Sequence, residues 1–315
     1  MRCRSFRAYG LVVESGFALP GVATARGEAY GPLVSVGLAT HEAVSERWSG
    51  ARAEPDWETV LGDGIALRHE VGMAGDQRLV YGSDIFLIAP DARSVLCAVE
   101  HPDDPGWRRQ LLDTVLFSVS FANGFELLHA SAVEVDDGIA AFVAPSGGGK
   151  SSLAAELCRR GHPIVCDDVL AIGRSGAELV GHPGPAVMSV PSSGVGAAGL
   201  AASVIARFES EDELWVVLED ATARSGPLRA VYVLDRAAED GFVSKITAPT
   251  VLDLLPHTIS LPHDAGRARR RFELFSALAE QVDMFQLGGR ANAGPGELAD
   301  LVEISFDRST HLVAG

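Results

Sequence analysis

The sequence contains only four cysteines among its 315 residues, and they form no CxxC pair. Cys3, Cys97, Cys158 and Cys166 have neither the spacing of a zinc site nor that of a disulfide framework, so we expect reduced thiols and a cytoplasmic protein. Long hydrophobic runs are also absent. No stretch of 18 consecutive apolar residues occurs and none follows the basic start of the chain, so we expect no signal peptide, membrane anchor or membrane-spanning helix.

Positive charge is scarce, because 26 Lys and Arg residues face 42 Asp and Glu residues and give a net charge of −16. Nucleic-acid backbones are bound by clustered Lys and Arg, so we expect no nucleic-acid partner. One basic cluster opens a helix expected over Ala265–Gln281, and it consists of Arg267, Arg269, Arg270 and Arg271. We interpret it as a solvated helix surface, with contact to an anion or an acidic partner as the alternative. The apolar face expected for this helix contains Phe272, Phe275, Leu278 and Ala279.

Apolar residues make up 47% of the chain and charged residues 22%, as is usual for globular proteins, and the length predicts about two domains. Residues 1–104 are predicted to form a strand-rich N-terminal domain, with strands over Tyr9–Glu14 and Asp84–Ala89. Residues 105–315 are predicted to form a mixed α/β domain.

The elements of the α/β domain are predicted from the spacing of apolar residues and from turn-forming residues. Helices are expected over Trp107–Phe121, Lys150–Arg160 and near Gly296–Glu303. A hairpin is expected from Leu127–Val135 and Ile139–Val143 around Asp136-Asp137-Gly138. Further strands are expected over Pro163–Cys166, Leu214–Leu218, Leu228–Leu234 and Met284–Leu287. The small-residue stretch Ser192–Ala202 is interpreted as a loop or lid.

A glycine-rich loop joins the second hairpin strand to the following helix: Ala144-Pro145-Ser146-Gly147-Gly148-Gly149-Lys150-Ser151. It matches the phosphate-binding loop pattern except that alanine replaces the first glycine. Glycines let backbone N–H groups approach a phosphate chain, and the start of the helix adds unpaired N–H groups and a partial positive charge. Lys150 is expected to reach the β- and γ-phosphates, and the Ser151 hydroxyl to ligate Mg²⁺.

Two aspartates, Asp167 and Asp168, follow the strand that comes after this helix. One carboxylate is expected to bind Mg²⁺ and the other to accept a proton from an attacking hydroxyl. Because neighbouring strand residues point to opposite faces, their joint action requires a bend in the chain. His129 lies on a predicted strand, where a histidine is more often a hydrogen-bonded core residue than a catalytic one.

The segments Leu128–Ala132, Ala144–Ser151 and Arg160–Asp168 resemble, in order and spacing, the catalytic core of HPr kinase/phosphorylase. The wider layout, with Phe6–Leu11 and Pro227–Leu234, resembles HPr-kinase-related proteins of bacterial gene clusters, among them lasso-peptide precursor kinases. The resemblance implies a phosphoenolpyruvate-carboxykinase-like P-loop kinase domain with a mixed sheet.

The resemblance also implies functions for individual residues. Asp167 would be the general base for a serine hydroxyl, Asp168 its neighbour near the metal, and His129 a polar residue of the active site. The nucleotide site would comprise Pro145, Ser146, Gly147, Gly148, Gly149, Lys150, Ser151 and Ser152. Ser152 stands where the family usually has an acidic residue, and the family's second glycine-rich signature has no match here.

The sequence thus predicts an enzyme that uses ATP and Mg²⁺ to phosphorylate a serine or similar hydroxyl of a peptide or small protein. Two alternatives remain: a small-molecule hydroxyl kinase, and a nucleotide-binding regulatory protein without catalysis. The acceptor, the choice of ATP over GTP, the reverse reaction and homo-oligomer formation are left open.

Overall fold

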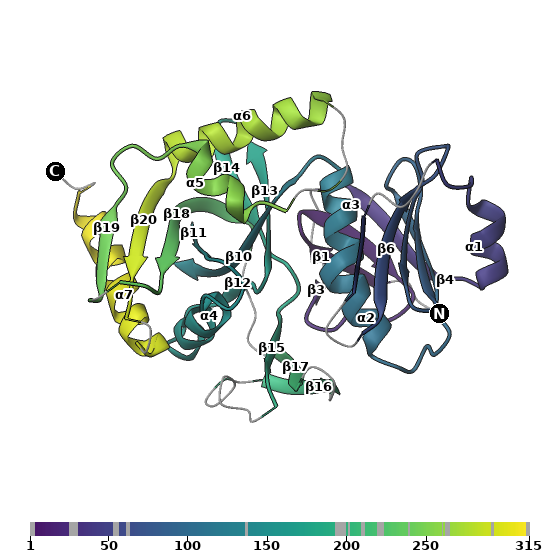
Figure 1. Ribbon diagram of the computed structural model, residues 1–315, viewed down its shortest axis with the longest axis horizontal. Coiled ribbons are helices and arrows are strands. Elements are labelled where there is room, and N and C mark those ends of the chain that lie inside the picture. The colour runs from purple at the N-terminus through teal and green to yellow at the C-terminus, as the bar shows by residue number, and fades with distance from the viewer. Residues whose placement is uncertain are drawn as a thin grey trace.

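The computed structural model describes residues 4–24, 31–52, 57–60, 64–135, 138–192, 200, 202–208, 212–218, 224–238, 240–259, 261, 265–290 and 293–312. It is a mixed α/β structure with a nine-stranded, an eight-stranded and a three-stranded sheet. The nine-stranded sheet lies beside the eight-stranded sheet, and the three-stranded sheet projects below them (Figure 1). Among the described residues, no helix is both long and apolar enough to cross a membrane.

The nine-stranded sheet takes all its strands from the first hundred residues, in the spatial order β3-β1-β2-β4-β9-β8-β7-β6-β5. Its strands pair antiparallel except for β2 with β4 and β4 with β9, which are parallel. Their bounds are β1 Arg4–Ala8, β2 Leu11–Ser15, β3 Ala23–Thr24, β4 Leu33–Leu38, β5 Trp57–Val60, β6 Ala66–Val71, β7 Gln77–Tyr81, β8 Asp84–Ile88 and β9 Ser94–Ala98, with helix α1 at His41–Arg47.

The strand predicted over Tyr9–Glu14 begins two residues too early. Tyr9 and Gly10 form a tight turn between β1 and β2, with φ angles of +54° and +78°. A glycine here avoids strain, and it also avoids the Phe125 ring, which would lie 2.5 Å from an added Cβ. Because apolar residues stand both before and after the turn, the sequence pattern indicated one continuous strand and not a turn.

A helical segment follows the nine-stranded sheet, as predicted for Trp107–Phe121. It comprises α2 (Gly106–Gln110), a π-helical turn η1 (Leu111–Val115) and α3 (Leu116–Ala122). Its apolar face, from Trp107 to Val119, is buried in one core with strands of the nine-stranded sheet. The same core includes Leu127 and Trp215 from later segments, so the division of the chain after residue 104 stays a prediction.

The eight-stranded sheet carries the loop and the acid pair. Along its path the order is β11-β10-β13-β14-β18-β20-β19, β12 pairs with β10, and β11 also pairs with β18 in parallel. The strands are β10 Glu126–Val135, β11 Gly138–Val143, β12 Ile164–Cys166, β13 Val169–Ser175, β14 Glu178–His182, β18 Gly226–Asp235, β19 Phe242–Lys245 and β20 Asp283–Gly288. The predicted hairpin is confirmed by the antiparallel pairing of β10 with β11, although Asp136 and Asp137 of its turn lie outside the described residues.

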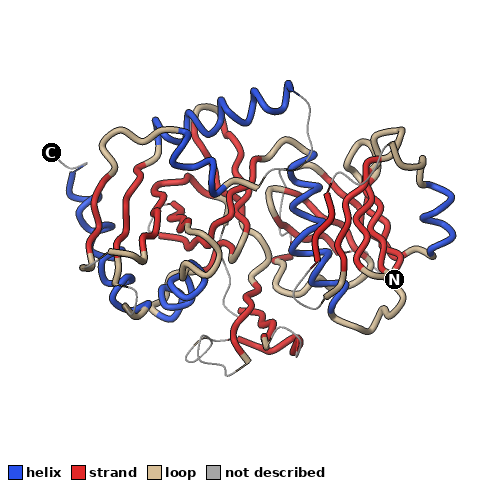
Figure 2. Tube along the Cα trace, viewed as in Figure 1, coloured by secondary structure: helices blue, strands red, loops and turns tan. Residues whose placement is uncertain are grey.

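The three-stranded sheet consists of β15 (Val187–Pro191), β17 (Glu213–Leu218) and β16 (Ala202–Phe208). Most of the predicted loop or lid at Ser192–Ala202 lies outside the described residues. The helices of the second half are α4 Lys150–Arg159, α5 Val251–Leu254, the 3₁₀ turn η3 Leu255–His257, α6 Ala265–Gln281 and α7 Pro295–Leu312. Figure 2 shows these helices on the outside of the eight-stranded sheet.

Helix α6 has the predicted bounds, but two of the predictions about its surface are wrong. Phe272 is 56% exposed, whereas Phe275 and Leu278 are fully buried. Arg267 and Arg271 are buried rather than solvated. Arg267 forms an ion pair of 2.9 Å with the buried Glu126, and this long-range partner could not be recognised from helix periodicity.

Candidate functional site

The glycine-rich loop leaves β11 at Val143 and enters α4 at Lys150, as the sequence predicts. Gly147 and Gly149 have φ angles of +74° and +92°, which side chains disfavour. Gly148 has an ordinary φ, but an added Cβ would lie 2.6 Å from the Ala144 Cβ and 2.9 Å from the Pro145 carbonyl oxygen. The backbone therefore requires all three glycines. Ala144 has no positive φ, so its replacement of the usual glycine causes no strain.

Lys150 is a buried residue at the first position of α4, and its Nζ donates a hydrogen bond of 3.1 Å to the Ala144 carbonyl oxygen. Burial lowers its pKa, while the carboxylates of Asp168 and Asp167 oppose that change. The Lys150 ammonium therefore interacts electrostatically with both acids. Around it, Pro145, Ser146 and Ser152 are exposed and Ser151 is half-buried.

The two aspartates occupy a bend between β12 and β13, which supplies the change of direction that their joint action requires. Asp168 has a φ of +76° in this bend. The Ser131 hydroxyl donates a hydrogen bond of 2.8 Å to Asp167 Oδ1. Burial and the neighbouring Asp168 carboxylate raise the pKa of Asp167, while hydrogen bonds from Ser131 and Ser151 oppose the rise. The acid pair is thus connected to the hydroxyl of Ser151, the second residue of α4.

Two histidines interact electrostatically with Lys150. His129 lies on β10, and burial together with the Lys150 ammonium lowers its pKa while the Asp168 carboxylate opposes this. His257, in η3, is buried, and Lys150 and His129 both contribute to the lowering of its pKa after burial itself. Nothing in the sequence spacing of His257 relates it to the loop. The backbone bond from Ile259 to Leu127 brings this segment beside β10.

Two further polar residues of this domain, His182 and Arg229, lie outside the site. His182 hydrogen-bonds to the Ser225 hydroxyl at 2.9 Å and packs edge-on against Phe125. Arg229 is exposed and lies 3.7 Å from Glu178. Neither lines the pocket described next.

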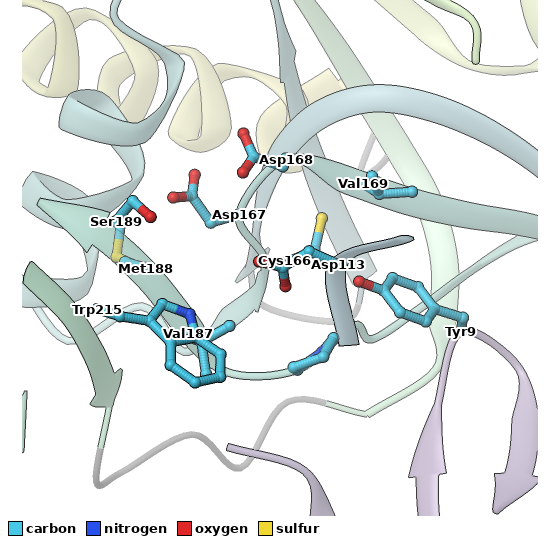
Figure 3. A pocket seen from close by; sticks show the side chains of 11 residues that line it. Tyr9, Asp113, Cys166, Asp167, Asp168, Val169, Val187, Met188, Ser189 and Trp215 are labelled. Atoms are coloured by element: carbon cyan, nitrogen blue, oxygen red, sulfur yellow. The ribbon is translucent and has the colours of Figure 1, made fainter. Parts of the chain in front are cut away.

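A pocket of about 50 Å³ opens beside the acid pair. Figure 3 shows that its walls come from parts of the chain far apart in sequence. The lining residues are Tyr9, Asp113, Cys166, Asp167, Asp168, Val169, Pro185, Val187, Met188, Ser189 and Trp215. Tyr9, Asp113, Ser189 and Trp215 were not identified from the sequence, because no local pattern distinguishes them.

Arg109 lies next to this pocket and is held by several partners. Its Nη2 donates to the Ser189 hydroxyl and to the Glu213 carboxylate, both at 3.1 Å, and its Nε lies 3.7 Å from the Asp113 carboxylate. The guanidinium also stacks on the Phe208 ring at 4.7 Å. Arg109 thereby connects the helical segment to the three-stranded sheet.

Within the described parts of the chain, no group of three or more His, Cys, Asp or Glu residues is arranged to hold a metal ion. The oxygen atoms gathered here are those of Ser151, Asp167 and Asp168. One or two carboxylates and a hydroxyl are typical protein ligands for Mg²⁺ where phosphate oxygens complete the coordination. The residues therefore fit a metal that arrives with a nucleotide better than a protein-only metal centre.

No protein-family model matches this chain, and no curated protein matches it. Among solved structures, the chain is similar to the Hpr(Ser) kinase/phosphatase from Coxiella burnetii. That match has 14% sequence identity and a TM-score of 0.33, and it covers 58% of this chain and 98% of that chain. Similarity at this level does not define the fold or the activity of this chain, which have to be argued from its own residues.

Proposed function

We propose that the chain is a phosphotransferase that binds ATP with Mg²⁺ at the loop of residues 144–151 and phosphorylates a hydroxyl group. The observations that carry this proposal are the glycine-rich loop that enters α4 at Lys150 and the electrostatic interaction of Lys150 with the Asp167–Asp168 pair. A phosphate chain would be bound by backbone N–H groups of the loop and by the Lys150 ammonium. Ser151 and a carboxylate of the pair would hold Mg²⁺, which neutralises charge on the transferring phosphoryl group.

The remaining side chains suit the acceptor side of such a transfer. Asp167 lines the pocket, and its raised pKa makes its carboxylate a stronger base for a hydroxyl proton. Asp168 follows Asp167 in the bend, and its carboxylate interacts electrostatically with His129 and Lys150. The hydrogen bond between Ser151 and Asp167 supports a second assignment, in which Asp167 serves the metal and Asp168 is the base. His129 and His257 would line the nucleotide side next to Lys150.

The acceptor that we propose is a serine, or a similar hydroxyl, of a peptide or small protein. The pocket of about 50 Å³ admits one small side chain. A small-molecule hydroxyl would also fit this volume and is therefore the second candidate acceptor.

Two separate experiments, on nucleotide binding and on phosphoryl transfer, test this function. Titration with Mg-ATP should show uptake by the wild type and a loss of at least tenfold in affinity for Lys150→Ala. Incubation with γ-labelled ATP, a serine-peptide pool and a metabolite pool should label one acceptor, which mass spectrometry identifies. Absence of Mg-nucleotide uptake by the wild type would refute the proposal as a whole.

Two variants distinguish the assignments of the acid pair. Asp167→Asn should retain nucleotide binding but lose about 10²- to 10⁴-fold in transfer rate, as expected for removal of a general base. Asp168→Asn should instead raise the Mg²⁺ concentration needed for half-maximal transfer. The opposite pattern would reverse the two assignments, and the exposed Asp103 supplies a matched Asp→Asn control. Transfer by Asp167→Asn and Asp168→Asn at the wild-type rate would exclude both residues as the base.

A further inference from the structure

Part of the pocket wall is built by residues outside the glycine-rich loop and the acid pair. Tyr9 comes from the turn between β1 and β2, and Asp113 comes from the π-helical turn η1. Ser189 and Trp215 come from the three-stranded sheet. Single π-helical turns within α-helices occur frequently at functional sites. Three separate segments of the fold therefore converge on one small space.

Tyr9 has a feature that points to a ligand. Its side chain is buried, with only 4% of the residue exposed, and its ring packs against Gly184, where an added Cβ would lie 2.9 Å away. Within the described part of the chain, no group hydrogen-bonds to the Tyr9 hydroxyl. Figure 3 shows this hydroxyl directed toward Asp113 and Cys166. Because Tyr9 lines the pocket, its hydroxyl is free to hydrogen-bond to a ligand bound there.

The charge of the pocket limits which ligands fit. Three of its lining side chains are carboxyl groups, those of Asp113, Asp167 and Asp168, and none of its described lining residues is basic. The neighbouring Arg109 is shared among Glu213, Ser189 and Asp113, and its Nε lies 3.7 Å from the Asp113 carboxylate. A nucleotide on the loop side would add further negative charge. An anionic acceptor would therefore be repelled, whereas a positively charged one would be attracted.

We propose that Tyr9 and Asp113 bind the acceptor and select a serine hydroxyl flanked by basic residues in a peptide. Asp113 attracts the flanking positive charge, and the Tyr9 hydroxyl hydrogen-bonds to the acceptor. The overall charge of −16 would also favour the approach of a basic peptide. This inference rests on the proposed function, because it names the acceptor class for the same site.

The test measures binding rather than turnover, so that it can be read even if transfer is slow. Wild-type protein is saturated with Mg²⁺ and a non-hydrolysable ATP analogue, then titrated calorimetrically with three capped serine pentapeptides. In these peptides the serine is flanked on both sides by Lys, by Gln or by Glu. We expect affinity to fall in that order, with at least a tenfold difference between the Lys and Glu peptides.

Two variants assign this selectivity to residues. Asp113→Asn should reduce the ratio between the Lys and Glu peptides at least threefold while the affinity for the nucleotide analogue is retained. Tyr9→Phe should weaken all three peptides by about three- to tenfold, the value of one hydrogen bond, and leave their ratio unchanged. The matched controls are Asp103→Asn, at an exposed turn residue, and Tyr81→Phe, at a half-buried residue of β7, and both should behave as wild type.

Each contrary outcome has a distinct meaning. Equal or stronger binding of the Glu peptide, an unchanged ratio in Asp113→Asn, or no binding of any peptide to the nucleotide-loaded protein would overturn the inference. Failure of the proposed function is recognised separately, because it appears as absence of nucleotide uptake. The peptide titrations would then be made without nucleotide and judged by the same ratios.

Discussion

The buried ion pair between Arg267 and Glu126 gives a stability prediction that can be worked out from the structure. The two side chains are 10% and 3% exposed, and their charged atoms are 2.9 Å apart. Arg267 also donates to the Phe125 carbonyl oxygen and stacks on the Phe121 ring at 4.3 Å. These contacts attach helix α6 to the start of β10, three residues before His129.

Replacing Arg267 with alanine leaves the Glu126 carboxylate buried without its main partner. Removing one member of a buried ion pair costs about 3–5 kcal/mol. Arg269→Ala is the matched control on the same helix, because Arg269 is 81% exposed and pairs with the exposed Glu273. An exposed pair of this spacing contributes only about 0.3–0.5 kcal/mol.

The assay is urea unfolding followed by circular dichroism, with the stability change taken from the shift in midpoint at constant slope. The double variant Glu126→Leu/Arg267→Met should recover most of the loss, because paired apolar residues often replace a buried ion pair at little cost. A loss below about 1 kcal/mol for Arg267→Ala would refute the reasoning, since a pair of this burial cannot be truncated so cheaply. Equal losses for the variants at positions 267 and 269 would also refute it.

Three further outcomes are expected. Gly148→Ala should abolish Mg-ATP uptake, because its Cβ would clash with Ala144, whereas Gly294→Ala faces open space and should bind normally in the same titration. Burial lowers the pKa of His182 to about 4, so this histidine should contribute about 1–3 kcal/mol of destabilisation as the pH falls from 6.5 to 4, because the unfolded histidine gains its proton first. His182→Asn should lack this loss in urea titrations, and parallel pH curves would contradict the prediction. Burial raises the pKa of Asp113 to about 7, so ionisation of this group should contribute a loss of stability as the pH rises from 4 to 7, opposite in sign to the contribution of His182. Asp113→Asn should therefore melt at a higher temperature than wild type at pH 8 but not at pH 4. The gain in the free energy of unfolding should be only about 1–2 kcal/mol, because a third of the Asp113 side chain is exposed.

The local elements of the candidate site were predicted from the sequence. The strand, glycine-rich loop and helix around Lys150 follow from neighbouring residues, because the positive φ angles at Gly147 and Gly149 are a local property of the backbone. The need for a bend at Asp167–Asp168 likewise follows from the alternation of side chains along a strand. The bounds of the 265–281 helix were also confirmed. The ligands, the functions of the acids and the acceptor stay proposals.

The sequence by itself determined which segments form the phosphate-type loop and the acid pair, since each depends on residues within a few positions of one another. The tertiary structure alone decided that Tyr9, Asp113 and Trp215 share a pocket with Asp167, that the segment of His257 lies beside β10, and that Arg267 is buried. Those contacts join residues tens to hundreds of positions apart. Such pairings depend on how sheets and helices pack, and no periodicity within one segment encodes its distant partner.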